Sequence, residues 1–128
     1  MFVHASIRTG NMERSIDFYC NFLGLKIISR RSIPKNNAEI VFLQDLKAKG
    51  CKLELTQYKS QTKFTQAEYE DRLFDHLAFE VQDIQYTIEM MRKAEISITD
   101  EPFKLEDDGP WLAFVEDPDG TLIELIQR

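Results

Sequence analysis

The sequence predicts an α+β fold built from two similar βαβββ modules that form a curved, open mixed sheet. Related segments recur in the two halves of the chain at a nearly constant offset, which indicates an internal repeat. Each half also places one helix-like segment among strand-like segments. The matched positions are His4, Met12 and Ile16 with His76, Ile84 and Ile88 at an offset of 72, and Glu54 with Glu124 at an offset of 70.

The first half reads as a strand, a helix and three further strands. Asn11 is a favourable N-cap for the helix, and Gly24 is a favourable residue to end it. Apolar residues between them recur at the spacing of one helix face, which we assign to the core. The expected segments are a strand at Phe2–Arg8, a helix at Met12–Leu23 and strands at Leu25–Ile33, Ala38–Leu46 and Cys51–Tyr58.

The second half repeats this order. Asp83 is placed to cap its helix as Asn11 caps the first. The segment Asp117-Pro118-Asp119-Gly120 is a turn signal, so we expect it to join the last two strands as a hairpin. The expected segments are a strand at Leu73–Val81, a helix at Ile84–Ala94 and strands at Ile96–Leu105, Trp111–Glu116 and Thr121–Gln127.

The repeat divides the chain into a first module at residues 1–58, a linker at residues 59–72 and a second module at residues 73–128. We expect the two modules to form one structural domain. The linker is polar, and Thr65 followed by Glu68 has the capping-box pattern that predicts a short helix.

Composition and charge limit the kinds of partner. The chain has 128 residues, of which 43% are hydrophobic and 30% charged, as in ordinary folded proteins. Its net charge of −6 argues against a nucleic-acid or anionic-membrane partner, because phosphate binding draws on clustered lysine and arginine. No apolar run approaches the length of a membrane span and no signal-like segment follows Met1, so we expect a cytoplasmic protein.

Two histidines and two glutamates stand at repeated positions and carry the chemistry. His4 and His76 lie in the first strand of each module, and Glu54 and Glu124 lie in the last. Apolar residues flank Glu124, and an ionised carboxylate in such a place requires a metal, a cation or a proton. Glu54 repeats this setting, with Lys52 on its face as an alternative partner. Pseudo-two-fold packing of the modules would bring the four side chains to one point.

Two imidazoles and two carboxylates are the ligands of a divalent transition metal. They suit Ni²⁺, Zn²⁺, Co²⁺, Fe²⁺ or Mn²⁺ better than Ca²⁺, which prefers oxygen alone. Cys20 and Cys51 lack the Cys-x-x-Cys spacing of a thiolate zinc site, so we exclude such a site. The sequence therefore predicts a metal site enclosed by the curved sheet.

Arg8 is a candidate for binding a substrate. It lies on the same strand face as His4, at about 13 Å if each residue advances the strand by ~3.3 Å. A permanent cation at that place suits a carboxylate on a small ligand. The spacing is equally consistent with an ordinary surface arginine.

Several motifs resemble the glyoxalase I (lactoylglutathione lyase) family in its short bacterial form, within the vicinal-oxygen-chelate or glyoxalase–bleomycin resistance superfamily. The resemblance covers essentially the whole chain, and the residue types at His4, Glu54, His76 and Glu124 match the four ligand positions of that family. The motifs are Met12–Tyr19, Leu23-Gly24-Leu25, Leu53-Glu54-Leu55-Thr56, His76-Leu77-Ala78-Phe79, Ala113–Gly120 and Ile123-Glu124-Leu125.

This resemblance implies a vicinal-oxygen-chelate fold and a metal-dependent lyase for methylglyoxal detoxification. The hemithioacetal of methylglyoxal and a thiol would become a 2-hydroxyacyl thioester through an enediolate. Glu124 would be the first candidate for the base and Glu54 the second, with His4 and His76 as permanent metal ligands. Arg8 would grip the γ-glutamyl carboxylate of glutathione. Nickel or zinc would be the first candidates for the metal, and the protein would be a homodimer whose sites are shared between chains.

Two departures from the family pattern leave the thiol open between glutathione and another low-molecular thiol. In the family, an asparagine stands four residues after the second ligand. Here the segment reads Glu54-Leu55-Thr56-Gln57-Tyr58, so Tyr58 occupies that position. The glycine before the third ligand is replaced by Asp75.

Two other classes of function fit the same resemblance less well: another metalloenzyme of the superfamily, and a non-catalytic binding protein. An extradiol dioxygenase uses two histidines and one glutamate, so Glu54 would occupy a position that it keeps open, and epimerases of the superfamily have a glutamine there. A drug-binding resistance protein of the same fold is not catalytic and typically lacks the metal ligands that this chain retains.

Overall fold

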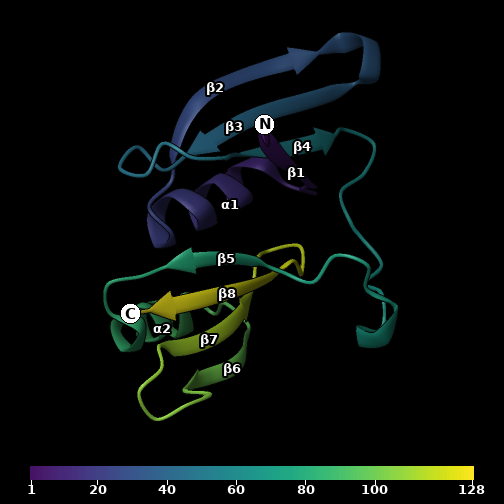
Figure 1. Cartoon of the computed structure of the whole chain (residues 1–128). Coiled ribbons are helices and arrows are strands. Elements are labelled where there is room, and N and C mark those ends of the chain that lie inside the picture. Colours follow the sequence, from purple (N-terminus) through teal and green to yellow (C-terminus); the bar gives the residue numbers. More distant parts are fainter. The chain divides into compact units, whose positions relative to one another are not determined.

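The order strand, helix, three strands occurs twice along the chain (Figure 1). The computed structural model describes residues 1–128 and divides them into two compact units, Met1–Phe64 and Thr65–Arg128. The boundary falls inside the segment that the sequence marks as a linker. None of the helices is long and apolar enough to span a membrane.

Unit 1 is a four-stranded sheet with a helix on one face. The strand order is β1-β4-β3-β2, with β1 parallel to β4 and the other neighbours antiparallel. Its elements are β1 (His4–Arg8), α1 (Met12–Asp17), the π-helical turn η1 (Phe18–Phe22), β2 (Lys26–Ile33), the 3₁₀ turn η2 (Pro34–Asn36), β3 (Ala38–Gln44) and β4 (Lys52–Tyr58).

Unit 2 has the same topology, with the strand order β5-β8-β7-β6 and β5 parallel to β8. The segment Asp117-Pro118-Asp119-Gly120 joins β7 to β8 as a hairpin, as the sequence predicts. Its elements are the 3₁₀ turn η3 (Tyr69–Asp71), β5 (Leu77–Glu80), α2 (Ile84–Lys93), β6 (Ile98–Phe103), β7 (Trp111–Glu116) and β8 (Leu122–Gln127).

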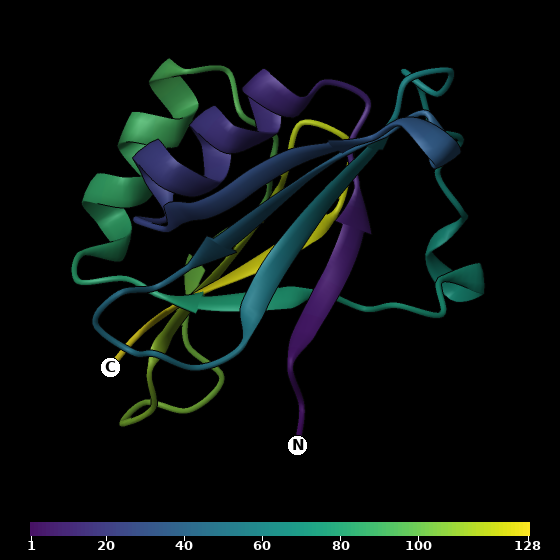
Figure 2. The same cartoon turned by 90° about the horizontal axis from the view of Figure 1, so that it is seen from above.

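Strand alternation separates the core of each unit from its ligand-bearing face. In β4, Leu53 and Leu55 are buried, whereas Glu54 points to the opposite face. In β8, Ile123 and Leu125 are fully buried and Glu124 again points away from them. Each helix packs on strands of its own unit, α1 on β4 and α2 on β6, β7 and β8. Figure 2 shows both helices from above. The core side therefore faces the helix, and the other face carries Glu54 in unit 1 and Glu124 in unit 2.

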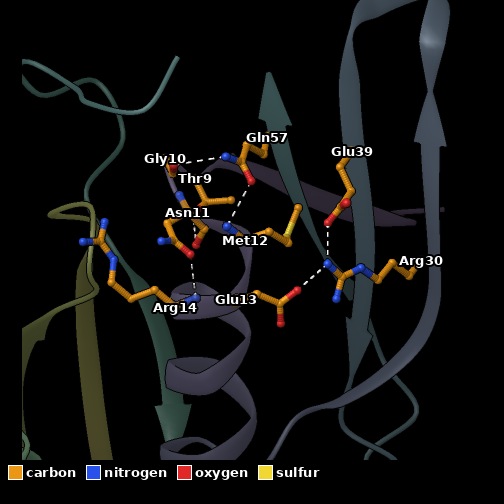
Figure 3. A network of polar contacts seen from close by, with 9 residues as sticks. All are labelled: Thr9, Gly10, Asn11, Met12, Glu13, Arg14, Arg30, Glu39 and Gln57. Carbon is orange, nitrogen blue, oxygen red and sulfur yellow. Dashed lines mark hydrogen bonds and ion pairs between the residues drawn. The ribbon is translucent and has the colours of Figure 1, made fainter. Parts of the chain in front are cut away.

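The same amide side chain joins helix and sheet in both units. Gln57 accepts a hydrogen bond from the backbone N–H of Met12 at 3.0 Å and donates one to the carbonyl of Gly10 at 3.1 Å (Figure 3). At the end of β8, Gln127 accepts from the backbone N–H of Ile84 at 2.7 Å. Each glutamine thus satisfies a donor at a helix N-terminus that the helix itself leaves open.

Two further contacts fix α1 in unit 1 (Figure 3). The side chain of Asn11 accepts from the backbone N–H of Arg14 at 3.1 Å, so Asn11 is the N-cap that the sequence predicts. Asp83 caps α2 in the same way. Arg30 of β2 bridges Glu13 of α1 and Glu39 of β3, which ties the helix to two strands.

Several predicted boundaries are wrong. The predicted helix Met12–Leu23 is α-helical only to Asp17 and continues as the π-helical turn. The predicted strand Leu73–Val81 begins only at Leu77, because Leu73 and Phe74 are exposed and unpaired. A short helix does lie in the linker, but it begins at Tyr69 with Glu68 as its N-cap, so Thr65 is not the cap.

Candidate metal centre

His4 and Glu54 lie side by side in unit 1. They project from the neighbouring parallel strands β1 and β4, and Nε2 of His4 is 3.5 Å from Oε2 of Glu54. The Glu54 side chain is 14% exposed and that of His4 is 39% exposed. A carboxylate therefore sits largely out of water with one imidazole in front of it.

Unit 2 holds the equivalent pair. Nε2 of His76 is 3.2 Å from Oε2 of Glu124, and these side chains are 28% and 16% exposed. Glu124 projects from β8, whereas His76 lies one residue before β5 begins. The prediction that His76 belongs to a strand is therefore wrong, although its side chain reaches the expected carboxylate.

An aromatic ring stands beside each histidine at the matching place. Phe42 lies opposite Glu54 in the β3–β4 ladder, and its ring meets that of His4 edge-on at 5.3 Å between centroids. Phe114 lies opposite Glu124 in the β7–β8 ladder and meets His76 edge-on at 5.6 Å. The histidine, the glutamate and the aromatic wall thus recur as one local arrangement.

The two pairs fit a divalent transition metal. Ligand atoms bound at about 2.1 Å to one ion are about 3.0–3.4 Å apart in octahedral or tetrahedral geometry. The Nε2–Oε2 separations of 3.5 and 3.2 Å lie close to that range. Within either unit, no group of three or more potential ligands comes together, so each unit holds one His–Glu pair.

The surroundings of the two glutamates differ. Oε1 of Glu54 accepts hydrogen bonds from the hydroxyls of Ser6 at 2.9 Å and Thr56 at 2.7 Å. No hydroxyl contacts Glu124 in unit 2. Lys52, the alternative partner that the sequence suggests for Glu54, makes no ion pair with it.

The two histidines differ as well. Nδ1 of His76 is 2.5 Å from the carboxylate of Asp75, and His4 has no such partner. A carboxylate at Nδ1 leaves Nε2 as the atom directed at Glu124, which is how the second nitrogen of a metal-binding histidine is usually held.

Arg8 lies on the same face of β1 as His4, as predicted from its spacing. Its guanidinium sits over the ring of Tyr58, 4.8 Å from the centroid, and donates to the side-chain carbonyl of Gln61 at 3.1 Å. The guanidinium is therefore held in place by the Tyr58 ring and by Gln61. This arrangement can present a positive charge to an anionic group on a ligand.

Sequence reasoning missed the roles of the residues that hold the candidate ligands. Ser6, Thr56 and Asp75 all lie within two residues of a candidate ligand or beside one in the strand ladder. The signal that could have identified Ser6 is its position, because residue 6 pairs with Glu54 when β1 and β4 run parallel in the observed register.

Comparison with known proteins points to one family. Residues 1–125 match the Glyoxalase/Bleomycin resistance protein/Dioxygenase superfamily. The chain is 31% identical to a probable lactoylglutathione lyase of Synechocystis, over 98% of this chain and 93% of that protein. It is also 31% identical to a lactoylglutathione lyase of Neisseria meningitidis, over 98% of this chain and 89% of the relative.

Solved structures show the same likeness. A trypanothione-dependent glyoxalase I of Leishmania major superposes with a TM-score of 0.81 at 32% identity, over 99% of this chain and 86% of that one. Glyoxalase I of Zea mays gives a TM-score of 0.82 at 29% identity, and this chain covers 44% of its length. The paired modules therefore match the fold of solved glyoxalase I enzymes.

Proposed function

The chain belongs to the Glyoxalase/Bleomycin resistance protein/Dioxygenase superfamily, and from its likeness to lactoylglutathione lyases and to a solved glyoxalase I we infer that it is a glyoxalase I-type lyase. The reaction converts the hemithioacetal of methylglyoxal and a thiol into a 2-hydroxyacyl thioester. The observation that carries the proposal is the repeated His–Glu pair, His4 with Glu54 and His76 with Glu124. A non-catalytic binding protein has no need of two such pairs.

Glyoxalase I enzymes use a divalent metal, and we assign its binding to these four residues. The donor types and the separation within each pair support the assignment. Both cysteines are free thiols outside the pairs, and the donor set contains nitrogen and oxygen only. Ni²⁺ and Zn²⁺ are the first candidates, followed by Co²⁺, Mn²⁺ and Fe²⁺. When bound, the ion supplies Lewis-acid stabilisation for negative charge on the substrate oxygens.

The chain's own residues then move the proton. The reaction breaks the C1–H bond of the hemithioacetal and delivers that proton to C2, by way of an enediolate. Glu124 is the base in this proposal, because it is largely removed from water and its carboxylate contacts only His76 among polar side chains. Glu54 is the second carboxylate, and His4 and His76 stay in place as ligands.

Arg8 binds the thiol part of the substrate. Its guanidinium, held by Tyr58 and Gln61, suits a carboxylate such as that of the γ-glutamyl group of glutathione. Replacing Arg8 by alanine should raise KM for the thiol adduct much more than it lowers kcat. An unchanged KM with every thiol tested would make Arg8 an ordinary surface arginine.

We also propose a homodimer in which each metal site takes one pair from each chain. This follows the resemblance to short bacterial glyoxalases. Each unit carries one His–Glu pair, which is half of the four-ligand set, and this supports a site built from two units.

One experiment tests the function. Metal-free protein is prepared by chelation, loaded with each divalent ion in turn, and assayed with methylglyoxal plus glutathione or plus another low-molecular thiol. Activity that depends on the ion and on the thiol supports the proposal. Full activity of the metal-free protein, or none with any pairing of ion and thiol, would overturn it.

A further inference from the structure

The carboxylate of Glu54 is anchored by two hydroxyls on one side only. Thr56 donates to Oε1 of Glu54 at 2.7 Å, and Ser6 donates to the same oxygen at 2.9 Å. The two hydroxyl oxygens are also 3.2 Å apart, so they form a compact group around Oε1. Oε2 is left to face His4. Only one oxygen of Glu54 is therefore available as a ligand.

The matching positions of unit 2 cannot form this anchor. Ala78 pairs with Glu124 in the β5–β8 ladder, as Ser6 pairs with Glu54 in the β1–β4 ladder. Ile126 lies two residues beyond Glu124 on the same face of its strand, where Thr56 lies relative to Glu54. Neither alanine nor isoleucine has a hydroxyl, so Oε1 of Glu124 accepts no such bond.

The two glutamate side chains are about equally buried, so burial does not distinguish Glu54 from Glu124. The side chains of Glu54 and Glu124 are 14% and 16% exposed, and each faces one imidazole. Hydrogen bonds to an ionised acceptor are among the stronger ones, so turning the Glu54 carboxylate would break two strong bonds. Turning the Glu124 carboxylate breaks no hydrogen bond from a hydroxyl. The two carboxylates therefore differ in how freely they can rotate, although they are about equally exposed.

We propose that Ser6 and Thr56 are positioning residues, which hold Glu54 as a fixed one-oxygen ligand and thereby leave Glu124 as the carboxylate that turns to move the proton. The inference rests on the proposed glyoxalase I function. Glu124 takes the proton released when the C1–H bond breaks and returns it to C2, while the hydroxyl proton passes from the C1 oxygen to the C2 oxygen, so the product is an isomer of the hemithioacetal and protons balance. Because one carboxylate delivers the proton, it reaches C2 from one face and gives one enantiomer of the product.

The first test removes the anchor. Ser6→Ala combined with Thr56→Val keeps the size of both side chains nearly unchanged while deleting both hydroxyls. We expect the affinity for Co²⁺, measured by titration without substrate, to fall about tenfold, as for other lost partners of metal ligands. We also expect both enantiomers of the hydroxy acid after hydrolysis of the product, since Glu54 is then free to turn as well.

Two controls separate positioning from a structural role. Ser6→Ala combined with Thr56→Ser has one hydroxyl more than the double variant, and it should recover most of the affinity and the single enantiomer. Ser32→Ala removes a surface hydroxyl of β2 from the parent protein and should change neither. Melting temperatures confirm that each variant is folded. A double variant that keeps the parent's Co²⁺ affinity and one enantiomer would overturn the proposal.

The second test builds the anchor in unit 2. Ala78→Ser with Ile126→Thr places hydroxyls beside Glu124, so turnover should fall at least tenfold while Co²⁺ affinity stays equal or increases. Unchanged turnover would count against the proposal.

Parent protein that binds Co²⁺ but shows no glyoxalase activity would overturn the proposed function alone, because the affinity measurements still decide the anchoring. Parent protein that binds no metal would overturn both.

Discussion

Nδ1 of His76 and the carboxylate of Asp75 are 2.5 Å apart, although Asp75 is 75% exposed. The contact lies on the side of the ring away from Glu124, which faces Nε2. It therefore holds the imidazole with Nε2 toward Glu124. No residue does this for His4, because Val3 stands before it.

The first prediction follows from this contact. Asp75→Ala should weaken Zn²⁺ or Ni²⁺ binding by about tenfold, because the ring of His76 loses the partner that orients it. Calorimetric titration of metal-free protein measures the effect. Asp71→Ala, an exposed acidic residue in the same unit, is the matched control and should bind metal as the parent does. Equal affinities for both variants would show that the Asp75 contact does not serve the metal.

The second prediction concerns the base. Glu124→Gln keeps the size and one oxygen donor but cannot accept the proton, so turnover should fall by at least about 10²-fold while some metal binding survives. His76→Ala should lose metal binding instead. Steady-state kinetics and metal analysis of the same preparations distinguish the two losses. Near-normal turnover by Glu124→Gln would make Glu54 the working base.

The third prediction concerns the glutamines that join helix to sheet. Gln127→Ala should lower the free energy of unfolding by about 1–2 kcal/mol, since the N–H of Ile84 loses its acceptor at 2.7 Å. Gln57→Ala should act similarly through Met12 and Gly10. Urea unfolding gives the values, and Gln85→Ala on the exposed face of α2 is the control. A loss no larger than that of the control would show that water replaces the bond without penalty.

The fourth prediction tests sharing of sites between chains. A chain with His4→Ala and Glu54→Ala is mixed with a chain that carries His76→Ala and Glu124→Ala, under conditions that permit subunit exchange. A shared site restores one complete ligand set in each heterodimer, so activity should return. Two inactive parents that remain inactive, after exchange is demonstrated by mass, would place each site within a single chain.

The order of elements could be predicted from the sequence because periodicity and caps act locally. Asn11 and Asp83 mark both helix starts, and the turn before β8 is encoded in four residues. The start of β5 could not be predicted in this way. Leu73 and Phe74 are apolar like strand residues, yet pairing rather than composition decides where a strand begins.

The candidate ligands could be identified from the repeat, but their supporting contacts could not. His4 and Glu54 repeat as His76 and Glu124 along the chain, and repetition is visible in sequence alone. The anchor that Ser6 provides for Glu54 depends on the register between two strands far apart in the chain. A shift of that register by one residue would turn Ser6 to the other face.

The most direct test of a single metal site built from both His–Glu pairs is the coordination of the bound ion. Metal analysis should find one Ni²⁺ or Zn²⁺ per chain, and X-ray absorption spectroscopy of that sample should show two imidazole ligands, with oxygen donors and no sulfur. Two ions per chain with one imidazole each would mean that every pair binds its own metal. A sulfur ligand, or no bound ion, would contradict the assignment of His4, Glu54, His76 and Glu124 as one site.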